Sequence, residues 1–371
     1  MRHTQKCVPQ RLVFLLCLLS FWLAPLPAVA QDERPPDPLA ILFPQFAKLP
    51  APSWLKEGVR VTYAVMGSSR DDETMAAGGG YVQYDLVALD KRSAVANMRI
   101  FVENDAGGFT PSPAGSYVNL PGHGEFWVNP AALEDAEELE SDALAVVRYL
   151  RDDGSGGAHR VVRFEYTDGG RFVSEFDEES GILVFGSQSF VSDEGARGDG
   201  QLLLVNQRQI KPPWKGNGIP TWLEEDASFE FDGTFTRLDI AGNNIPLPAA
   251  AHFAVQKMSR RWSLAQADTY LNGIPVGGTL SATGAGQIFG GLWLPKAALT
   301  TRPHNSTLDS DPITGATITW QRSGSAILLT ETGPSWESAL RYDGKTGLLT
   351  DVRMTQQDAI GINVTELALT Q

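Results

Sequence analysis

The chain has 371 residues, and its 44 acidic side chains outnumber 30 basic ones, which gives a formal net charge of −14 at pH 7. A surface of this sign repels phosphate backbones, so nucleic acid is excluded as an expected partner. Both cysteines, Cys7 and Cys17, lie within the first 30 residues. The rest of the chain therefore has no disulfide, no thiolate metal site and no cysteine nucleophile.

Residues 1–30 have the pattern of a cleavable secretory signal peptide. Basic residues and an apolar run at 12–24 precede Ala28-Val29-Ala30, the small-x-small sequence that signal peptidase requires. The apolar run is shorter than the roughly 20 residues that a membrane-spanning helix needs. We therefore expect cleavage before Gln31, a secreted or periplasmic protein, and no transmembrane helix after cleavage. A retained anchor is the alternative.

The remainder of the chain contains the same short segments twice, in the same order. Their offsets, 164 to 169 residues, are far longer than the roughly 20–50 residues of a solenoid or propeller repeat. The sequence therefore predicts duplication of a whole domain. The clearest pairs are Trp54-Leu55-Lys56-Glu57 with Trp222-Leu223-Glu224-Glu225, Trp127 and Ala131-Ala132-Leu133 with Trp293 and Ala297-Ala298-Leu299, and Phe176-Asp177 and Gly181-Ile182-Leu183 with Tyr342-Asp343 and Gly347-Leu348-Leu349.

We place the first copy, unit 1, at residues 53–210 and the second copy, unit 2, at residues 221–371. Proline-rich residues 31–52 are expected to form an extended lead-in, and the Pro/Gly density of residues 211–220 indicates a linker.

Two of four notable tryptophans have a counterpart in the other unit, and two do not. Trp127 and Trp293 are counterparts, which indicates core packing because the fold has to be kept in both copies. Trp214 and Trp262 have no counterpart. We favour a place in the core for these two, with an aromatic binding surface as the alternative.

Within each unit, apolar and polar residues alternate with the two-residue period of half-buried strands, for example at 59–65 and 162–166. Gly181 and Gly347 fall in hairpin turns, where a positive φ favours glycine. The fold class predicted is mainly β, with two tandem copies of a curved antiparallel-sheet unit, each with about one short helix.

The predicted helices follow prolines at equivalent places in the two units. In unit 1, Asn129 can cap the helix, Pro130 suits its first turn, and residues 131–139 are good helix formers. In unit 2, Pro295 opens the matching segment at 296–299.

Unit 1 opens with Trp54-x-x-x-Gly58, and unit 2 contains the hairpin Tyr342-Asp343-x-x-Thr346-Gly347-Leu348-Leu349. In these features the chain resembles bacterial envelope proteins of the lipoprotein-carrier kind. The resemblance implies a curved antiparallel sheet that holds an acyl chain or another apolar ligand. It transfers no functional residue to this chain.

No catalytic residue is predicted. Ser141 and Ser310 each lie beside acids, which disfavour formation of an alkoxide. The glycine strings 78–80 and 284–286 lack the strand–turn–helix setting of a nucleotide site, and we expect them to be loops. The four histidines after residue 30 lack the spacing of zinc ligands: His123, His159, His252 and His304.

Asp309 and Asp311 form the best candidate metal site, because two carboxylates at this spacing can face the same way and calcium prefers hard oxygen ligands. Pro312 follows at once and the EF-hand pattern is absent, so we favour a simple turn or the start of a strand. We therefore predict no cofactor, with calcium as the alternative.

These observations favour an exported, non-enzymatic binding or envelope protein. Its ligand is unknown, and an apolar small molecule, a lipid or an envelope protein would suit a concave sheet or a cleft between the units. One alternative is a secreted glycan hydrolase that uses two carboxylates. Another is a structural partner in an envelope assembly, which would present an apolar patch or an open sheet edge.

Overall fold

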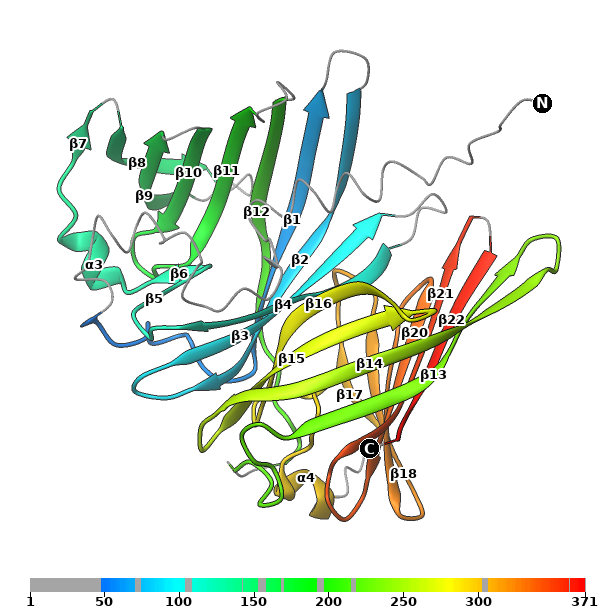
Figure 1. Cartoon of the computed structure of the whole chain (residues 1–371). Coiled ribbons are helices and arrows are strands. Elements are labelled where there is room, and N and C mark those ends of the chain that lie inside the picture. Colours follow the sequence, from blue (N-terminus) through cyan, green and yellow to red (C-terminus); the bar gives the residue numbers. More distant parts are fainter. Residues whose placement is uncertain are drawn as a thin grey trace, which may run out of the picture.

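The computed structural model describes residues 48–370 except 71–74, 104–108, 142, 153–157, 168–169, 192–196, 215–217, 302–305 and 360. The predicted signal peptide, its cleavage site and residues 31–47 of the lead-in lie outside the described residues. Two large curved sheets, one from each predicted unit, make up most of the described chain (Figure 1).

Sheet 1 has ten strands, all from unit 1, and every neighbouring pair in it is antiparallel. In spatial order the strands are β4 (Phe109–Asn119), β3 (Ala94–Glu103), β2 (Met75–Leu89), β1 (Val59–Arg70), β12 (Arg197–Gln209), β11 (Leu183–Val191), β10 (Gly170–Asp177), β9 (Ala158–Thr167), β8 (Leu144–Asp152) and β7 (Leu139–Glu140).

Sheet 2 repeats this order strand for strand in unit 2, so the predicted mainly β fold with two tandem copies is confirmed. Its strands, in spatial order, are β16 (Ile274–Gly284), β15 (Trp262–Leu271), β14 (Asn244–Met258), β13 (Ser228–Asp239), β22 (Gly361–Leu369), β21 (Leu349–Asp358), β20 (Trp336–Asp343), β19 (Ala326–Thr332), β18 (Thr317–Ser323) and β17 (Thr307–Ser310).

A tryptophan and a short helix close one end of each sheet. Trp127, in the small hairpin of β5 (His123–Gly124) and β6 (Trp127–Val128), bridges to Ile182, and Trp293 bridges to Leu348. The two indoles are 0% and 1% exposed, as core packing predicts. The helices that follow are α3 (Pro130–Glu134) and α4 (Lys296–Thr300). Within the described ranges, no helix has the length and hydrophobicity needed to cross a membrane.

The helix in unit 1 begins as predicted but is shorter. The Asn129 side chain accepts a hydrogen bond from the backbone N–H of Ala131, which caps the helix. The helix ends at Glu134 rather than at residue 139, because Leu139 and Glu140 pair with β8 as strand β7. Sheet pairing has overridden the helix propensity of this segment.

Alternation determines which side chains fill each unit. Val61 and Tyr63 point to the concave face of sheet 1 and are fully buried.

The expectation that residues 78–80 form a loop is wrong, because they lie within β2. A Cβ on Gly80 would lie 2.0 Å from the Phe101 carbonyl oxygen, so glycine is required here by close packing rather than by a turn.

The two predicted hairpin glycines have positive φ, 73° at Gly181 and 78° at Gly347. Gly181 also packs tightly, since a Cβ there would lie 1.9 Å from the Val128 carbonyl oxygen.

We therefore expect Gly181→Ala to destabilise the protein by more than the 1–2 kcal/mol, roughly, that a left-handed backbone costs a non-glycine residue. Gly324→Ala is the matched control, because Gly324 has φ of 59° but no atom within 4 Å of the added Cβ. Urea unfolding of both variants measures the difference. Equal losses would mean that the contact with Val128 contributes nothing.

Candidate functional site

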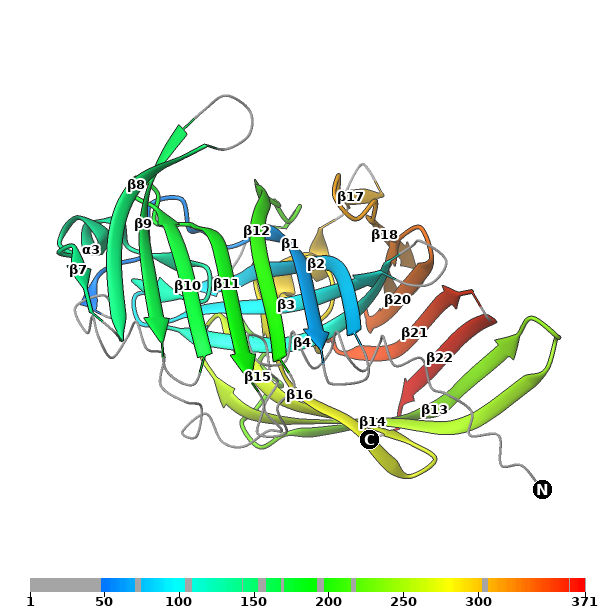
Figure 2. The same cartoon turned by 90° about the horizontal axis from the view of Figure 1, so that it is seen from above.

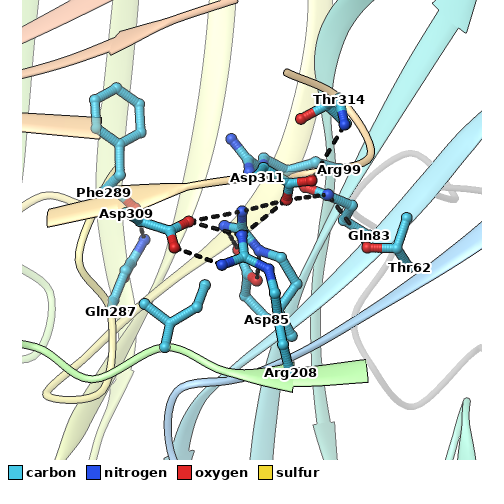
Figure 3. A network of polar contacts seen from close by, with 12 residues as sticks. Thr62, Gln83, Asp85, Arg99, Arg208, Gln287, Phe289, Asp309, Asp311 and Thr314 are labelled. Carbon is cyan, nitrogen blue, oxygen red and sulfur yellow. Dashed lines mark hydrogen bonds and ion pairs between the residues drawn. The ribbon is translucent and has the colours of Figure 1, made fainter. Parts of the chain in front are cut away.

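Asp309 and Asp311, the predicted calcium candidates, lie at the contact between the two units (Figure 3). They belong to the β17 edge of sheet 2, and the arginines that face them come from the convex face of sheet 1. None of these arginines is among the predicted site residues. They are Arg60 on β1, Arg208 on β12 and, beside them, Arg99 on β3.

Arg60 lies at the centre of this cluster and is only 3% exposed. Its guanidinium binds Asp85 with two hydrogen bonds, from Nε at 2.6 Å and Nη2 at 2.8 Å, and its Nη1 reaches Asp311 Oδ2 at 3.1 Å. The other oxygen of Asp311 accepts the backbone N–H groups of Ile313 and Thr314 at 2.9 and 3.1 Å. Both oxygens of this buried carboxylate are therefore used.

Arg208 binds the same two aspartates. It holds Asp309 with both Nη atoms and donates from Nη2 to Asp311 Oδ2 at 2.9 Å. Arg60 and Arg208 are partners in the β1–β12 register, so their guanidinium groups lie side by side. Asp311 lies between them and reduces their mutual repulsion.

Glu331 on β19 extends the cluster along sheet 1. It is 1% exposed and binds Nη1 of Arg99 through both carboxylate oxygens, at 2.8 and 2.7 Å. Gln83 on β2 connects the two parts, because it donates to Asp311 Oδ2 at 2.8 Å and accepts from Arg99 Nη2 at 3.0 Å. One hydrogen-bonded network thus joins four strands of sheet 1 to three segments of sheet 2.

Asp311 and Arg60 stay charged near neutral pH. Burial alone would raise the pKa of Asp311, but Arg60 and the N–H groups of Thr314 and Ile313 bring it well below its ordinary value. Burial would likewise lower the pKa of Arg60, yet the charge and hydrogen bonds of Asp85 raise it above the usual range.

The arrangement suits an anchor between units better than a metal site. Asp309 and Asp311 direct their side-chain oxygens to guanidinium and backbone N–H groups, which leaves the hard-oxygen cage of a calcium site unformed. In the described parts of the chain, no three His, Cys, Asp or Glu side chains are grouped to share a metal.

A comparison of the two copies is the sequence signal that could have found the arginines. The strand registers place Ser228, Ala254 and Asp268 of unit 2 where unit 1 has Arg60, Asp85 and Arg99. Residues that fold both copies are kept, whereas these three differ in charge. Such a difference points to a surface that only one copy uses.

Apolar contacts surround the ionic cluster. Trp262 and Leu264, on the convex face of sheet 2, are buried with Val87 and Val95 of sheet 1. Trp262 is therefore part of the contact between units and not an exposed binding surface. The other unmatched tryptophan, Trp214, packs in the core of unit 2 with its ring centroid 5.6 Å from that of Trp320.

Both edges of sheet 2 meet the convex face of sheet 1. At one edge, the β16 residue Ala282 donates its N–H to Ser116 Oγ at 2.7 Å and accepts from Asn97 Nδ2 at 3.0 Å. At the other edge, Asp309 and neighbouring residues bind the arginines. Sheet 1 therefore spans the opening between β16 and β17, as Figures 1 and 2 show in two views. The glycines of the 284–286 string allow this approach, since a Cβ on Gly284 would lie 2.4 Å from the Val87 carbonyl oxygen.

The concave faces of the two sheets differ in side-chain size. In sheet 1 this face is filled, and Tyr84 packs against Tyr63 and Phe126 with ring centroids 6.1 and 4.9 Å away. The registers define the equivalent positions in sheet 2, and four of them carry small residues. Val82, Met98, Ile100 and Tyr117 of unit 1 correspond to Ala251, Ala267, Thr269 and Ser281 of unit 2.

Exposure follows the same pattern. All four positions are buried in unit 1, whereas in unit 2 Thr269 is exposed and Ser281 half-buried although both face inward. Larger apolar side chains on the concave face of sheet 2 are also only half-buried, notably Phe235, Leu247 and Met354. This part of the concave face, which we call the cup, therefore has smaller and partly exposed side chains in unit 2 where unit 1 has larger buried ones.

A surface cavity of about 580 Å³ lies elsewhere, on β7, β8 and β9 of unit 1. Two acids line it, Glu140 and Glu165, but Glu165 binds Arg171 and Arg163. The hydrogen bond from Arg171 is the main reason why the pKa of Glu165 is lowered. The general acid of a glycosidase needs a raised pKa instead.

Comparisons with known proteins do not place the chain in a family. No family model matches it, and no curated protein matches it. Among solved structures, the chain is similar to an AttH candidate from Nitrosomonas europaea, with 11% identity over 84% of this chain and 92% of that chain. The TM-score is 0.16, which is too low to support an argument about fold or function.

The ionic cluster predicts a large effect of removing one carboxylate. Asp311→Ala removes the carboxylate shared by the buried Arg60 and the half-buried Arg208, and we expect a loss of about 3–5 kcal/mol in the free energy of unfolding. The exposed pair of Arg341 and Asp351, 3.9 Å apart, provides the control, and Asp351→Ala should cost less than about 1 kcal/mol. Urea unfolding at pH 7 decides, and similar losses would contradict the anchoring role.

The same carboxylate gives a pH dependence. Since the pKa of Asp311 is lowered in the folded state, its charge stabilises the fold above the unfolded pKa of about 3.9, and this stabilisation is lost as the pH falls towards the folded pKa. The stability difference between the natural protein and Asp311→Asn should therefore be largest at neutral pH and shrink in acid. A difference that is the same at pH 7 and pH 3 would contradict this assignment.

Proposed function

We propose that the protein is an exported, non-enzymatic binding protein and that the concave face of unit 2 holds an apolar ligand such as an acyl chain. The observation that carries this proposal is the replacement of four large or branched side chains of the unit 1 core by alanine, threonine or serine in unit 2. The exposed, inward-facing Thr269 marks the part of this surface that the protein itself leaves uncovered.

Apolar side chains that stay half-buried on a concave surface support an apolar ligand. Phe235 and Leu247 are paired across β13 and β14, and Met354 lies on the same face of β21. In unit 1 the corresponding volume belongs to the core, so copying alone does not explain an open face. After the duplication, unit 1 supplies a rigid packed core and unit 2 binds the apolar ligand.

The alternatives have less support. A carboxylate-dependent hydrolase requires two acids in one cleft, one of them with a raised pKa. Among the described residues, every carboxyl group whose pKa departs clearly from its ordinary value is shifted downward: Asp85, Glu165, Asp239, Asp311 and Asp343. A purely structural role in an envelope assembly would not require the smaller side chains of the unit 2 cup.

The test introduces the larger side chains of unit 1 at the equivalent positions on the concave face of unit 2. The double variant Ala267→Met, Thr269→Ile introduces the counterparts Met98 and Ile100 and should weaken binding of a fluorescent fatty acid, cis-parinaric acid, by tenfold or more. The reason is that each CH₂ group kept out of an apolar site costs about 0.8 kcal/mol. Fluorescence titration measures the dissociation constant.

Thr234→Ile is the matched control, because Thr234 lies on the convex side of β13 and is exposed. It adds the same side chain outside the cup and should leave binding unchanged. If the natural protein does not bind the probe, or if the control weakens binding as much as the double variant, the concave face is not the site.

A further inference from the structure

Exposed apolar side chains gather at one end of sheet 2. Ile240 is 83% exposed and Ile274 63%, which are unusual values for isoleucine. Six apolar residues at this end have exposed fractions between 36% and 83%, and we call them the rim: Leu238, Ile240, Ile245, Ile274, Val276 and Ile362.

The register places the rim residues at one end of sheet 2, where the β13–β14 tip extends about five residues beyond the β15–β16 tip because Leu271 pairs with Ala249. They occupy the tips of three hairpins, β13–β14, β15–β16 and β21–β22, whose strands are consecutive in sheet 2. Ala249 pairs with Leu271 and Asp239 pairs with Gly361, so the three tips are at the same end of the sheet. The β13–β14 and β21–β22 tips are visible at the upper right of Figure 1. Trp293 closes the opposite end of the sheet.

The hairpin tips hold these side chains in fixed positions. Asp239 accepts hydrogen bonds from the backbone N–H groups of Ala241 and Asn243 at 2.9 and 2.8 Å, which orders the turn that carries Ile240. Asn272 donates its N–H to the Pro248 carbonyl at 2.7 Å and orders the next turn. Because the turns are already ordered, contact with an apolar phase costs little conformational entropy.

The corresponding turns of unit 1 have the opposite chemistry. The residues that connect β1 to β2, β3 to β4 and β11 to β12 include six acids in the sequence, whereas the three unit 2 tips have only Asp239 and Asp358, which end β13 and β21. The six acids of unit 1 are Asp71, Asp72, Glu73, Asp105, Asp193 and Glu194. In a chain with a net charge of −14, the rim is a local exception to the acidic surface.

The charge at the rim also identifies the kind of surface that it fits. Arg237 is the one cation in the three hairpin tips as described, and it lies 3.7 Å from Asp358. Anionic phospholipid headgroups would find no basic cluster here, and a basic protein partner no acidic one.

We propose that the rim docks the protein on the surface of an electrically neutral lipid membrane, with the six apolar side chains inserted among the headgroups and upper acyl chains. Shallow insertion of isolated aliphatic side chains removes apolar area from water without burying the polar strands. This inference rests on the rim residues alone and does not depend on the ligand of the concave face.

The experiment measures binding to vesicles by flotation. The protein used begins at Gln31, because the apolar run at 12–24 would itself bind lipid. It should float with vesicles of pure phosphatidylcholine, with an affinity that changes less than about twofold between 50 and 500 mM salt, since no counterions are released. Added phosphatidylglycerol should not strengthen binding.

Variants locate the contact. Ile240→Asp and Ile274→Asp should each reduce vesicle binding by about tenfold or more. Val191→Asp is the matched control, because Val191 is 59% exposed and ends β11 at the corresponding hairpin of unit 1. It should bind as the natural protein does. All three variants should keep their affinity for cis-parinaric acid without vesicles, so failure here is distinguishable from failure of the proposed ligand site.

Three outcomes would overturn the proposal. One is an absence of binding to phosphatidylcholine. Another is binding that requires phosphatidylglycerol or disappears in salt, which would indicate an electrostatic contact elsewhere. The third is a concentration-dependent dimer, seen by light scattering, that Ile240→Asp dissociates while vesicle binding is unaffected. In that case the rim binds a second copy of the chain.

Discussion

The guanidinium of Arg60 determines how the two halves of the molecule fit together. A buried cation must have carboxylates within hydrogen-bond distance, and Asp85 from its own sheet satisfies only part of its fork. The remaining Nη1 requires Asp311, which belongs to the other unit. Hydrogen bonds of this kind are directional, so they fix the angle between the sheets in a way that the apolar contacts around Trp262 alone would not.

This fixed contact has consequences for the concave face of sheet 2. The opening between β16 and β17 would expose the interior of unit 2 to water, and the convex face of sheet 1 covers it. Unit 1 can act as a wall because its own interior is filled by Tyr63, Tyr84 and Phe126. Unit 2 is then free to exchange core volume for an accessible surface, since part of its stability comes from the neighbouring unit.

Much of the fold could be predicted from the sequence, because the duplicated segments and two-residue alternation are local patterns. Trp127 and Trp293 are core plugs as their equivalence indicates, and Gly181 and Gly347 have the positive φ of hairpin turns. The helix end at Glu134 was missed because sheet pairing by β7 is a long-range effect. The strand at 78–80 was missed because glycine there serves close packing and not a turn.

The candidate sites could be predicted only in part. Asp309 and Asp311 stand out as a pair, but their partners Arg60 and Arg208 are about 250 and 100 residues away in sequence, respectively, and look like ordinary solvent-facing strand residues. The smaller side chains of the cup appear in the sequence as Ala251 and Ala267. Their meaning appears only once the strand registers show which residues of unit 1 they replace.

The contact between the units is heterologous: the β17 edge of one copy meets the convex face of the other. Head-to-tail contacts between identical modules can be repeated, and they form a ring if the rotation closes or a filament if it does not. A third copy would need a convex face on unit 2 with the arginines of unit 1. Ser228 and Asp268 stand where Arg60 and Arg99 would be required, so an incoming acidic edge would find no cation and would meet a like charge. The substitutions that distinguish the second copy from the first therefore leave its convex face without the cations that would receive another β17 edge in the same way.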